Sequence, residues 1–170
     1  MKTIIRGRAF VFGDDVNTDE IIPGIRMRDI SDLTELSKYC FEPIRPNFWK
    51  EAKAGDIVVA GKNFGCGSSR EKAPLVIKET GIRVILAESF ARIFYRNAIN
   101  IGLPPLECKD ITQFVKEGDE LEIDLNEFTV RNITKDKSMQ LKRLPNFLIE
   151  MLQKGGLVPY LKEKGGYSII

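Results

Sequence analysis

The sequence predicts a single α/β domain over residues 1–170, and three observations support this fold class. Residues 56–88 contain an apolar strand, a glycine-rich loop, a helix and a second apolar strand, which is typical of a parallel βαβ unit. Alternating apolar and polar residues between 120 and 144 indicate antiparallel strands in a further layer. A chain of 170 residues with 43% hydrophobic and 29% charged residues suits one globular domain.

The N-terminal third is expected to contain one strand, one helix and two loops. A run of β-branched and aromatic residues that stops at Gly13 predicts the strand, and residues 14–24 predict a loop. Between residues 30 and 41 the apolar positions recur at helical spacing. Asp32 and Glu35 form a capping pair there, so we expect a short amphipathic helix. Residues 42–56 contain two prolines without a clear period and predict a connecting loop.

The βαβ unit begins at residue 56, and the remaining elements follow it in order. Its helix is expected over about residues 70–80, ended by Gly81, because Pro74 is tolerated only near a first turn. Residues 89–102 predict a second helix and residues 103–108 a strand. A hairpin is expected around Asn126 and Glu127, with a third strand over 138–144. Two short helices with glycine stops, from residues 146 and 157, close the chain.

Charge and composition exclude several classes of function. Twenty-six Lys and Arg against 24 Asp and Glu give a net charge of +2, which predicts neither a nucleic-acid nor a membrane partner. No apolar run has the length of a signal peptide or a membrane span. Three scattered cysteines, Cys40, Cys66 and Cys108, argue against a disulfide framework and for the cytoplasm. Without histidine or a CxxC pair we expect no metal site and no Ser-His-Asp triad in this chain.

The segment "NFGCGSSREKAP", residues 63–74, carries the candidate binding site. Its glycines match neither a Rossmann fingerprint nor a P-loop well. The hydroxyls of Ser68 and Ser69, the fork of Arg70 and the amides of a helix N-terminus favour a carboxylate or phosphate ligand. The alternative is a plain turn in which Ser68 or Ser69 caps the helix and Arg70 is solvated.

Three blocks of sequence in this order identify a resemblance to a known family. They are "FGDDVNTDEIIPG", "GKNFGCGSSREKAP" and "AESFARIFYRNAINIGLP". The chain resembles the small subunits of the isopropylmalate isomerases and homoaconitases, which are equivalent to the C-terminal swivel domain of aconitase. The resemblance covers nearly the whole chain and is less specific after Leu125. It implies a layered β/β/α swivelling domain.

The resemblance also implies a division of labour between two subunits. A large subunit is expected to carry a [4Fe–4S] cluster, which acts as a Lewis acid, and the catalytic histidines, so no cofactor is expected in this chain. By match of motif, Ser68 is the base that removes a proton from carbon. Arg70, with Ser69 beside it, binds a substrate carboxylate. Asp19 supports a histidine of the large subunit, or otherwise is an ordinary loop aspartate in an Asx-turn.

Two departures from the family pattern concern the surroundings of the site. Lys72 replaces the usual histidine after the glutamate of "SSRE". The substrate-recognition loop after Pro23 contains Arg26, Met27 and Arg28, with Arg28 at the position that distinguishes substrates. A substrate with an apolar tail requires an apolar wall in the site, and a substrate with an extra carboxylate requires a guanidinium. Arg28 therefore favours a substrate with an extra carboxylate. In the alternative, Arg28 faces solvent and Met27 contacts the substrate.

The implied reaction is the conversion of 2- to 3-isopropylmalate by dehydration and rehydration, in leucine biosynthesis. A homoaconitase or a dehydratase of a substituted malate is the neighbouring alternative, and these differ only in the recognition loop. An alternative of another class is a non-catalytic module that binds a small dicarboxylate and regulates a partner. The isolated chain is compatible with a homo-oligomer.

Overall fold

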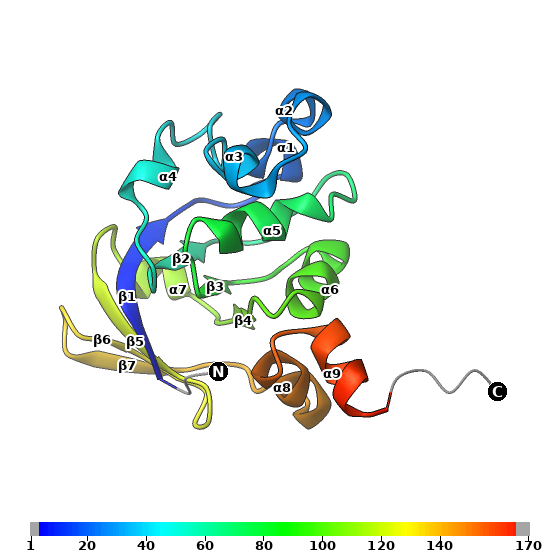
Figure 1. Cartoon of the computed structure of the whole chain (residues 1–170). Coiled ribbons are helices and arrows are strands. Elements are labelled where there is room, and N and C mark those ends of the chain that lie inside the picture. Colours follow the sequence, from blue (N-terminus) through cyan, green and yellow to red (C-terminus); the bar gives the residue numbers. More distant parts are fainter. Residues whose placement is uncertain (1–3, 166–170) are drawn as a thin grey trace.

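The computed structural model describes residues 4–165, which form one curled sheet flanked by helices (Figure 1). Neighbouring strands follow the order β4-β3-β2-β1-β5-β6-β7. The strands are β1 (Ile4–Val11), β2 (Ile57–Ala60), β3 (Val84–Ala87), β4 (Pro105–Glu107), β5 (Glu120–Asp124), β6 (Thr129–Asn132) and β7 (Lys137–Gln140).

The helices of the described residues are short, between four and nine residues long. None of those in the described part of the chain is long and apolar enough to cross a membrane. They are α1 (Thr18–Ile21), α2 (Gly24–Asp29), α3 (Leu33–Ser37), α4 (Phe48–Glu51), α5 (Lys72–Glu79), α6 (Arg92–Asn100), α7 (Ile111–Phe114), α8 (Asn146–Gln153) and α9 (Leu157–Glu163).

Strand β1 joins a parallel half of the sheet to an antiparallel half. Its residues 9–11 pair in parallel with β2, whereas its residues 4–8 pair antiparallel with β5. Strands β2, β3 and β4 continue in parallel, and β5, β6 and β7 continue as antiparallel neighbours. Because one long strand serves both halves, the antiparallel half can curl over the parallel half without breaking the sheet.

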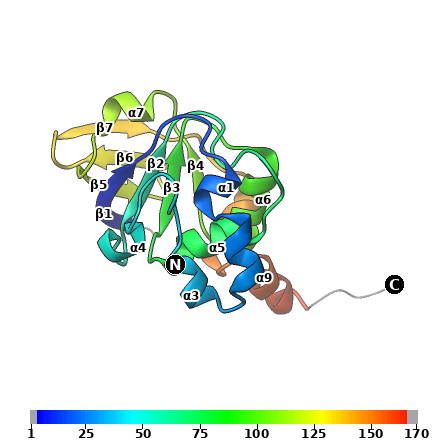
Figure 2. The same cartoon turned by 90° about the horizontal axis from the view of Figure 1, so that it is seen from above.

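Two hydrophobic cores cover the two faces of the parallel half. Strands β2 and β3 are buried at every position, as expected for strands covered on both faces. On one face, Val58 and Ile85 pack with residues of α3, α5 and α6. On the other, Val59 and Leu86 pack with residues of β5 and β6. Figure 2 shows β5–β7 on one side of β2 and β3, and α5 and α6 on the other. The expected layered β/β/α domain is therefore confirmed.

The longer predicted elements are confirmed, and four short helices, α1, α2, α4 and α7, lie where no helix was expected. Residues 14–24, expected to be a loop, contain α1 and the start of α2, and residues 42–56 contain α4. Helix α7 was not expected. A four-residue helix shows no period in the sequence, and local capping or tertiary anchoring must offset the cost of nucleating it. In α1 the Asn17 side chain accepts hydrogen bonds from the amides of Asp19 and Glu20. In α4 the anchor is the buried ring of Phe48.

Candidate active site

The candidate site lies where the parallel strands β1, β2 and β3 reach their carboxyl ends. The segments that follow these strands are tied together by parallel bridges between Asn17 and Cys66 and between Phe64 and Phe90. The amide of Thr18 also donates to the carbonyl oxygen of Cys66, at 2.8 Å. Carboxyl ends of parallel strands are where ligands bind in open α/β sheets.

Two glycines let the loop between β2 and α5 pass close to its neighbours. Gly65 has a φ of +79°, and a Cβ atom there would lie 2.2 Å from the ring of Phe94 in α6. Gly67 has a φ of +93° and lies against Thr18. A positive φ therefore accounts for both glycines, close packing against Phe94 also requires glycine at Gly65, and no phosphate is needed to explain them.

The hydroxyl of Ser68 is exposed and lies next to a cation. The Nε group of Arg70 donates a hydrogen bond to Ser68 Oγ at 3.0 Å. The Oγ1 of Thr18 donates to the backbone carbonyl of Ser68 at 2.9 Å and lies 3.4 Å from Ser68 Oγ. Thr18 is 2% exposed, so its hydrogen bond holds the backbone of Ser68 from the buried side of the loop. A cationic donor stabilises an alkoxide more than an alcohol, and this is the electrostatic setting that a serine base requires.

The guanidinium of Arg70 connects Ser68 to α1. Besides Ser68, it donates to the carbonyl oxygen of Ile22 at 2.7 Å and forms an ion pair with Asp19 at 2.6 Å. Its Nε and Nη1 groups thus donate hydrogen bonds, and the side chain is 16% exposed, so part of the guanidinium remains open to a ligand. The side chain of Asp19 is 64% exposed, so its carboxylate binds Arg70 and is still accessible from outside.

Neither serine caps the helix that follows the loop. Helix α5 begins at Lys72, and its N-cap residue Glu71 makes no capping hydrogen bond through its side chain. The alternative in which Ser68 or Ser69 is the cap is therefore wrong. In the described structure the exposed Ser69 has no hydrogen-bond partner, and no amide from Ser69 to Glu71 has an acceptor. The amides before α5 are thus free to face an anion.

A pocket of about 490 Å³ opens in front of Ser68 and Arg70, and helix α6 forms its other wall. From α6 come Arg92, Arg96 and Asn97, none of which the sequence analysis identified. A signal was present, because two arginines four residues apart share one face of a predicted helix. Thr18 was also missed, although it directly precedes Asp19 in the quoted motif.

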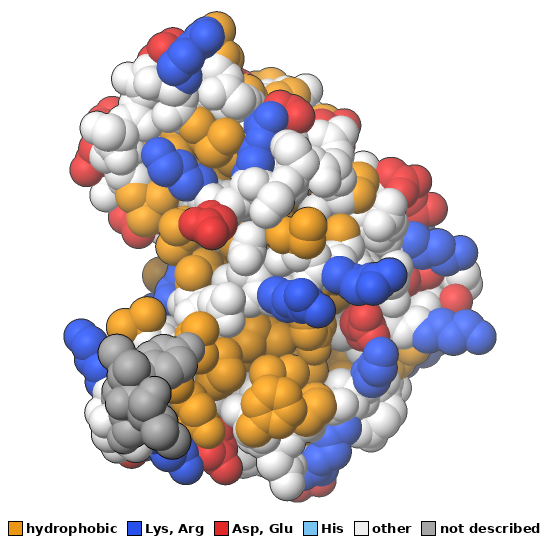
Figure 3. All heavy atoms as spheres, turned by 90° about the vertical axis from the view of Figure 1, so that its right-hand side faces the viewer, with side chains coloured by type: hydrophobic (Ala, Val, Ile, Leu, Met, Phe, Trp, Pro, Cys, Tyr) orange, Lys and Arg blue, Asp and Glu red, His pale blue; other side chains and the backbone are white. Residues whose placement is uncertain are grey.

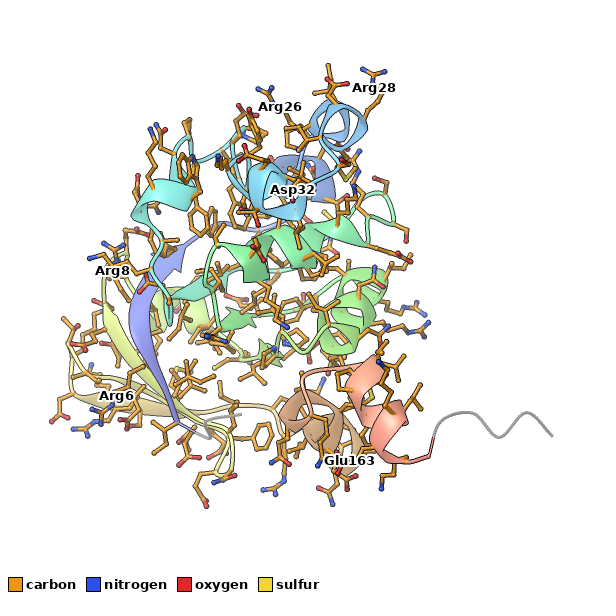
Figure 4. The ribbon with its side chains drawn as sticks, viewed as in Figure 1. Arg6, Arg8, Arg26, Arg28, Asp32 and Glu163 are labelled. Atoms are coloured by element: carbon orange, nitrogen blue, oxygen red, sulfur yellow. The ribbon has the colours of Figure 1, made fainter. Side chains whose placement is uncertain are left out.

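The recognition loop forms helix α2, which lies outside this pocket. Arg26 makes two hydrogen bonds with the carboxylate of Glu42, at 2.9 and 3.0 Å, and stacks on the ring of Tyr39. Met27 packs against the adjacent core. The side chain of Arg28 remains 75% exposed, and within residues 4–165 its ion pair with Asp29, at 3.7 Å, is its one polar contact. Figure 4 shows Arg26 and Arg28 at the outer end of the molecule. Arg28 is therefore the arginine of this loop that is available to a ligand.

The cysteines do not form a cluster site. Cys40 and Cys108 are buried in different cores, and Cys66 lies in the glycine loop. Burial raises the pKa of the Cys66 thiol, with a smaller contribution from Asp15. Within residues 4–165 no group of three or more His, Cys, Asp or Glu side chains is placed to hold a metal ion. The described residues therefore do not fit an iron–sulfur cluster, which needs several thiolates together.

The grouping of Ser68, Arg70 and Asp19 in front of a curled β/β/α sheet can be compared with known proteins. The sequence model of the aconitase C-terminal domain matches residues 20–111, more than half of the chain. The chain belongs to the aconitase C-terminal domain family. The match includes Ser68 and Arg70, and it begins at residue 20, directly after Asp19.

Curated relatives within the aconitase C-terminal domain family cover almost the whole chain. A protein of Archaeoglobus fulgidus named 3-isopropylmalate dehydratase small subunit 1 is 55% identical over 92% of this chain and 96% of its own length. A protein of Methanocaldococcus jannaschii named isopropylmalate/citramalate isomerase small subunit is 51% identical over 96% of this chain and 97% of its own.

A solved structure supports the same placement. The crystal structure described as 3-isopropylmalate dehydratase from M. jannaschii superposes with a TM-score of 0.90 at 49% identity. The superposition covers 95% of each chain. The curled sheet and its helices are therefore those of an aconitase-family small subunit over nearly their full extent.

Proposed function

We propose that this chain is the small subunit of a hydro-lyase that interconverts 2- and 3-isopropylmalate. The observation that carries the proposal is the hydrogen bond from Arg70 to the exposed hydroxyl of Ser68, with Asp19 on the same guanidinium. Relatives about 50% identical are named 3-isopropylmalate dehydratase small subunit, which supports this substrate. Their names also support a large subunit as partner.

Ser68 is the proposed base of the reaction. Its alkoxide, stabilised by Arg70 and by the open amides before α5, takes a proton from the carbon next to the one that bears the hydroxyl. The hydroxyl leaves as hydroxide, which the large subunit would accept, and a double bond forms between the two carbons. Hydroxide then adds to the carbon that lost the proton, and Ser68 returns its proton to the carbon that lost the hydroxyl. The open part of the Arg70 guanidinium binds a substrate carboxylate, with Ser69 beside it.

Asp19 is proposed to act toward the partner. One of its oxygens is bound to Arg70, and its exposed carboxylate is free to orient a group that arrives from the large subunit. Because the described cysteines do not fit a cluster, we place the [4Fe–4S] cluster on the large subunit. The residues described here then supply the base and the carboxylate binding.

The first expected result tests the division of labour. The purified chain alone should contain no iron and should not hydrate or dehydrate isopropylmalate, whereas activity should appear on mixing with the cluster-loaded large subunit. The measurements are an iron assay and the absorbance of the alkene intermediate. A stoichiometric cluster in the lone chain, or a mixture without activity on isopropylmalate, citramalate and homocitrate, would contradict the proposal. Activity on another of these substrates alone would keep the enzyme class and change the substrate.

The second expected result concerns selectivity. If the 75% exposed guanidinium of Arg28 reaches the site in the complex, an apolar isopropyl tail leaves it desolvated without a partner, whereas a carboxylate tail pairs with it. Arg28→Val should therefore raise kcat/KM for isopropylmalate relative to a tricarboxylate by about tenfold. Arg26→Val is the comparison, because Glu42 already holds Arg26. An unchanged ratio in Arg28→Val, together with a shift in Met27→Ala, would assign recognition to Met27.

A further inference from the structure

An apolar groove outside the candidate site lies between helix α6 and the C-terminal helices α8 and α9. Its volume is about 720 Å³, and it contacts each of these helices and the segment before α8. Figure 3 shows a broad apolar area on this face, with Lys and Arg side chains along its margins. Its lining includes Phe147 and Leu148 of α8, Leu157 of α9, and Tyr95 and Ile99 of α6.

The groove exposes side chains that normally avoid water. Phe147 is 57% exposed on α8, and Ile93, on the adjoining surface of α6, is 50% exposed. A continuous apolar area rimmed by charged groups is typical of a protein interaction site, and aromatic side chains contribute most of the affinity of such sites. Since Phe147 lines the groove and is still 57% exposed, a second surface covers it better than a small molecule does.

The groove continues into the candidate active site. Arg92 and Arg96 line both the groove and the pocket in front of Ser68, so the two hollows share a wall. In the proposed function the large subunit must close over that pocket to bring its cluster near Ser68. A subunit that covers the pocket therefore reaches the groove as well.

Charge indicates the chemistry of the surface that docks here. Across the described residues, neither Arg92 nor Arg96 has an ion-pair or hydrogen-bond partner, whereas Lys142 at the other rim is already paired with Glu107. Two unpaired guanidinium groups four residues apart on one helix face favour carboxylates on the partner.

We propose that this groove is the docking site for the large subunit, which inserts an apolar side chain beside Phe147 and places acidic residues on Arg92 and Arg96. The inference rests on the proposed function for the identity of the partner. It adds the surface that holds the two subunits together, which is separate from Ser68, Arg70 and Asp19.

The test measures assembly and catalysis separately in the complex of full-length subunits. Phe147→Ser should raise the dissociation constant for the large subunit by at least about tenfold, as measured by titration calorimetry. The kcat at saturating large subunit should stay at the wild-type value, because Phe147 lies outside the pocket. Trp49→Ser is the matched control: it also removes an exposed aromatic ring, but on α4, and should bind as the wild type does.

A second variant tests the charged rim. The double variant Arg92→Gln, Arg96→Gln should associate more slowly at low salt and lose most of the salt dependence of its association rate. Unchanged binding by Phe147→Ser would overturn the proposal, even if the wild-type pair is active. If Phe147→Ser instead dissociates a homodimer of the lone chain and leaves the affinity for the large subunit intact, the groove belongs to a second copy, and the proposal is also wrong.

The outcomes separate this inference from the proposed function. A wild-type pair that assembles through Phe147 but does not act on isopropylmalate refutes the substrate and leaves the docking site standing. A pair that acts on isopropylmalate but whose affinity does not depend on Phe147 refutes the docking site and leaves the proposed substrate standing.

Discussion

Ser68→Ala should lower kcat of the reconstituted enzyme by at least about two orders of magnitude, as loss of a general base commonly does. The substitution removes the oxygen that accepts the hydrogen bond from Arg70 Nε and leaves that donor facing the substrate. Ser68 is exposed, so the fold and the melting temperature should hardly change. Steady-state kinetics at saturating large subunit give kcat, and circular dichroism checks the fold.

Ser69→Ala is the matched control for this prediction. Ser69 is also exposed, but its hydroxyl has no hydrogen-bond partner in the part of the chain that is described. We expect a modest rise in KM and a kcat within a few-fold of the wild type. If Ser69→Ala abolished activity and Ser68→Ala retained it, the base would be Ser69 and the assignment made here would be off by one residue.

Arg70→Lys should lower kcat/KM by about 100-fold, and both constants should change. Arginine donates to Ser68 and to the carbonyl oxygen of Ile22 and forms an ion pair with Asp19 at the same time, whereas one ammonium group cannot reach all three in this geometry. The loss of a charge-assisted hydrogen bond typically costs about 1.5–3 kcal/mol. The rise in KM reflects the lost carboxylate contact, and the fall in kcat reflects the weaker support for the Ser68 alkoxide.

The dependence of kcat on pH distinguishes these two roles. If Arg70 stabilises the alkoxide, replacing it with lysine should raise the pKa of the Ser68 hydroxyl. The kcat of the variant should then still rise with pH in a range where the kcat of the wild type no longer changes. A variant with a higher KM but an unchanged kcat at every pH would show that Arg70 only binds substrate. Activity within a few-fold of the wild type would remove Arg70 from both roles.

The sequence by itself determined the elements whose local pattern is strong. Four consecutive buried apolar residues in each of β2 and β3, separated by a glycine loop and an amphipathic helix, led to the parallel βαβ unit. Asp32 was correctly expected to cap a helix, since its side chain accepts a hydrogen bond from the Glu35 amide. The motif blocks also led to Ser68, Arg70 and Asp19 as candidates, because a motif is a local feature that can be recognised without knowing the fold.

Only the tertiary structure decided how these candidates relate to one another. Thr18 and Ser68 are fifty positions apart in the sequence and meet because β1 and β2 are parallel neighbours, and so do Asp19 and Arg70. Arg26 and Arg28 lie two residues apart in the same recognition loop, yet the carboxylate of Glu42 binds Arg26, whereas Arg28 remains in solvent. Helical period and composition report on neighbours along the chain, whereas pairing across a sheet depends on long-range contacts that no local pattern specifies. For the same reason the groove beside Phe147 appeared only when α8 was placed against α6.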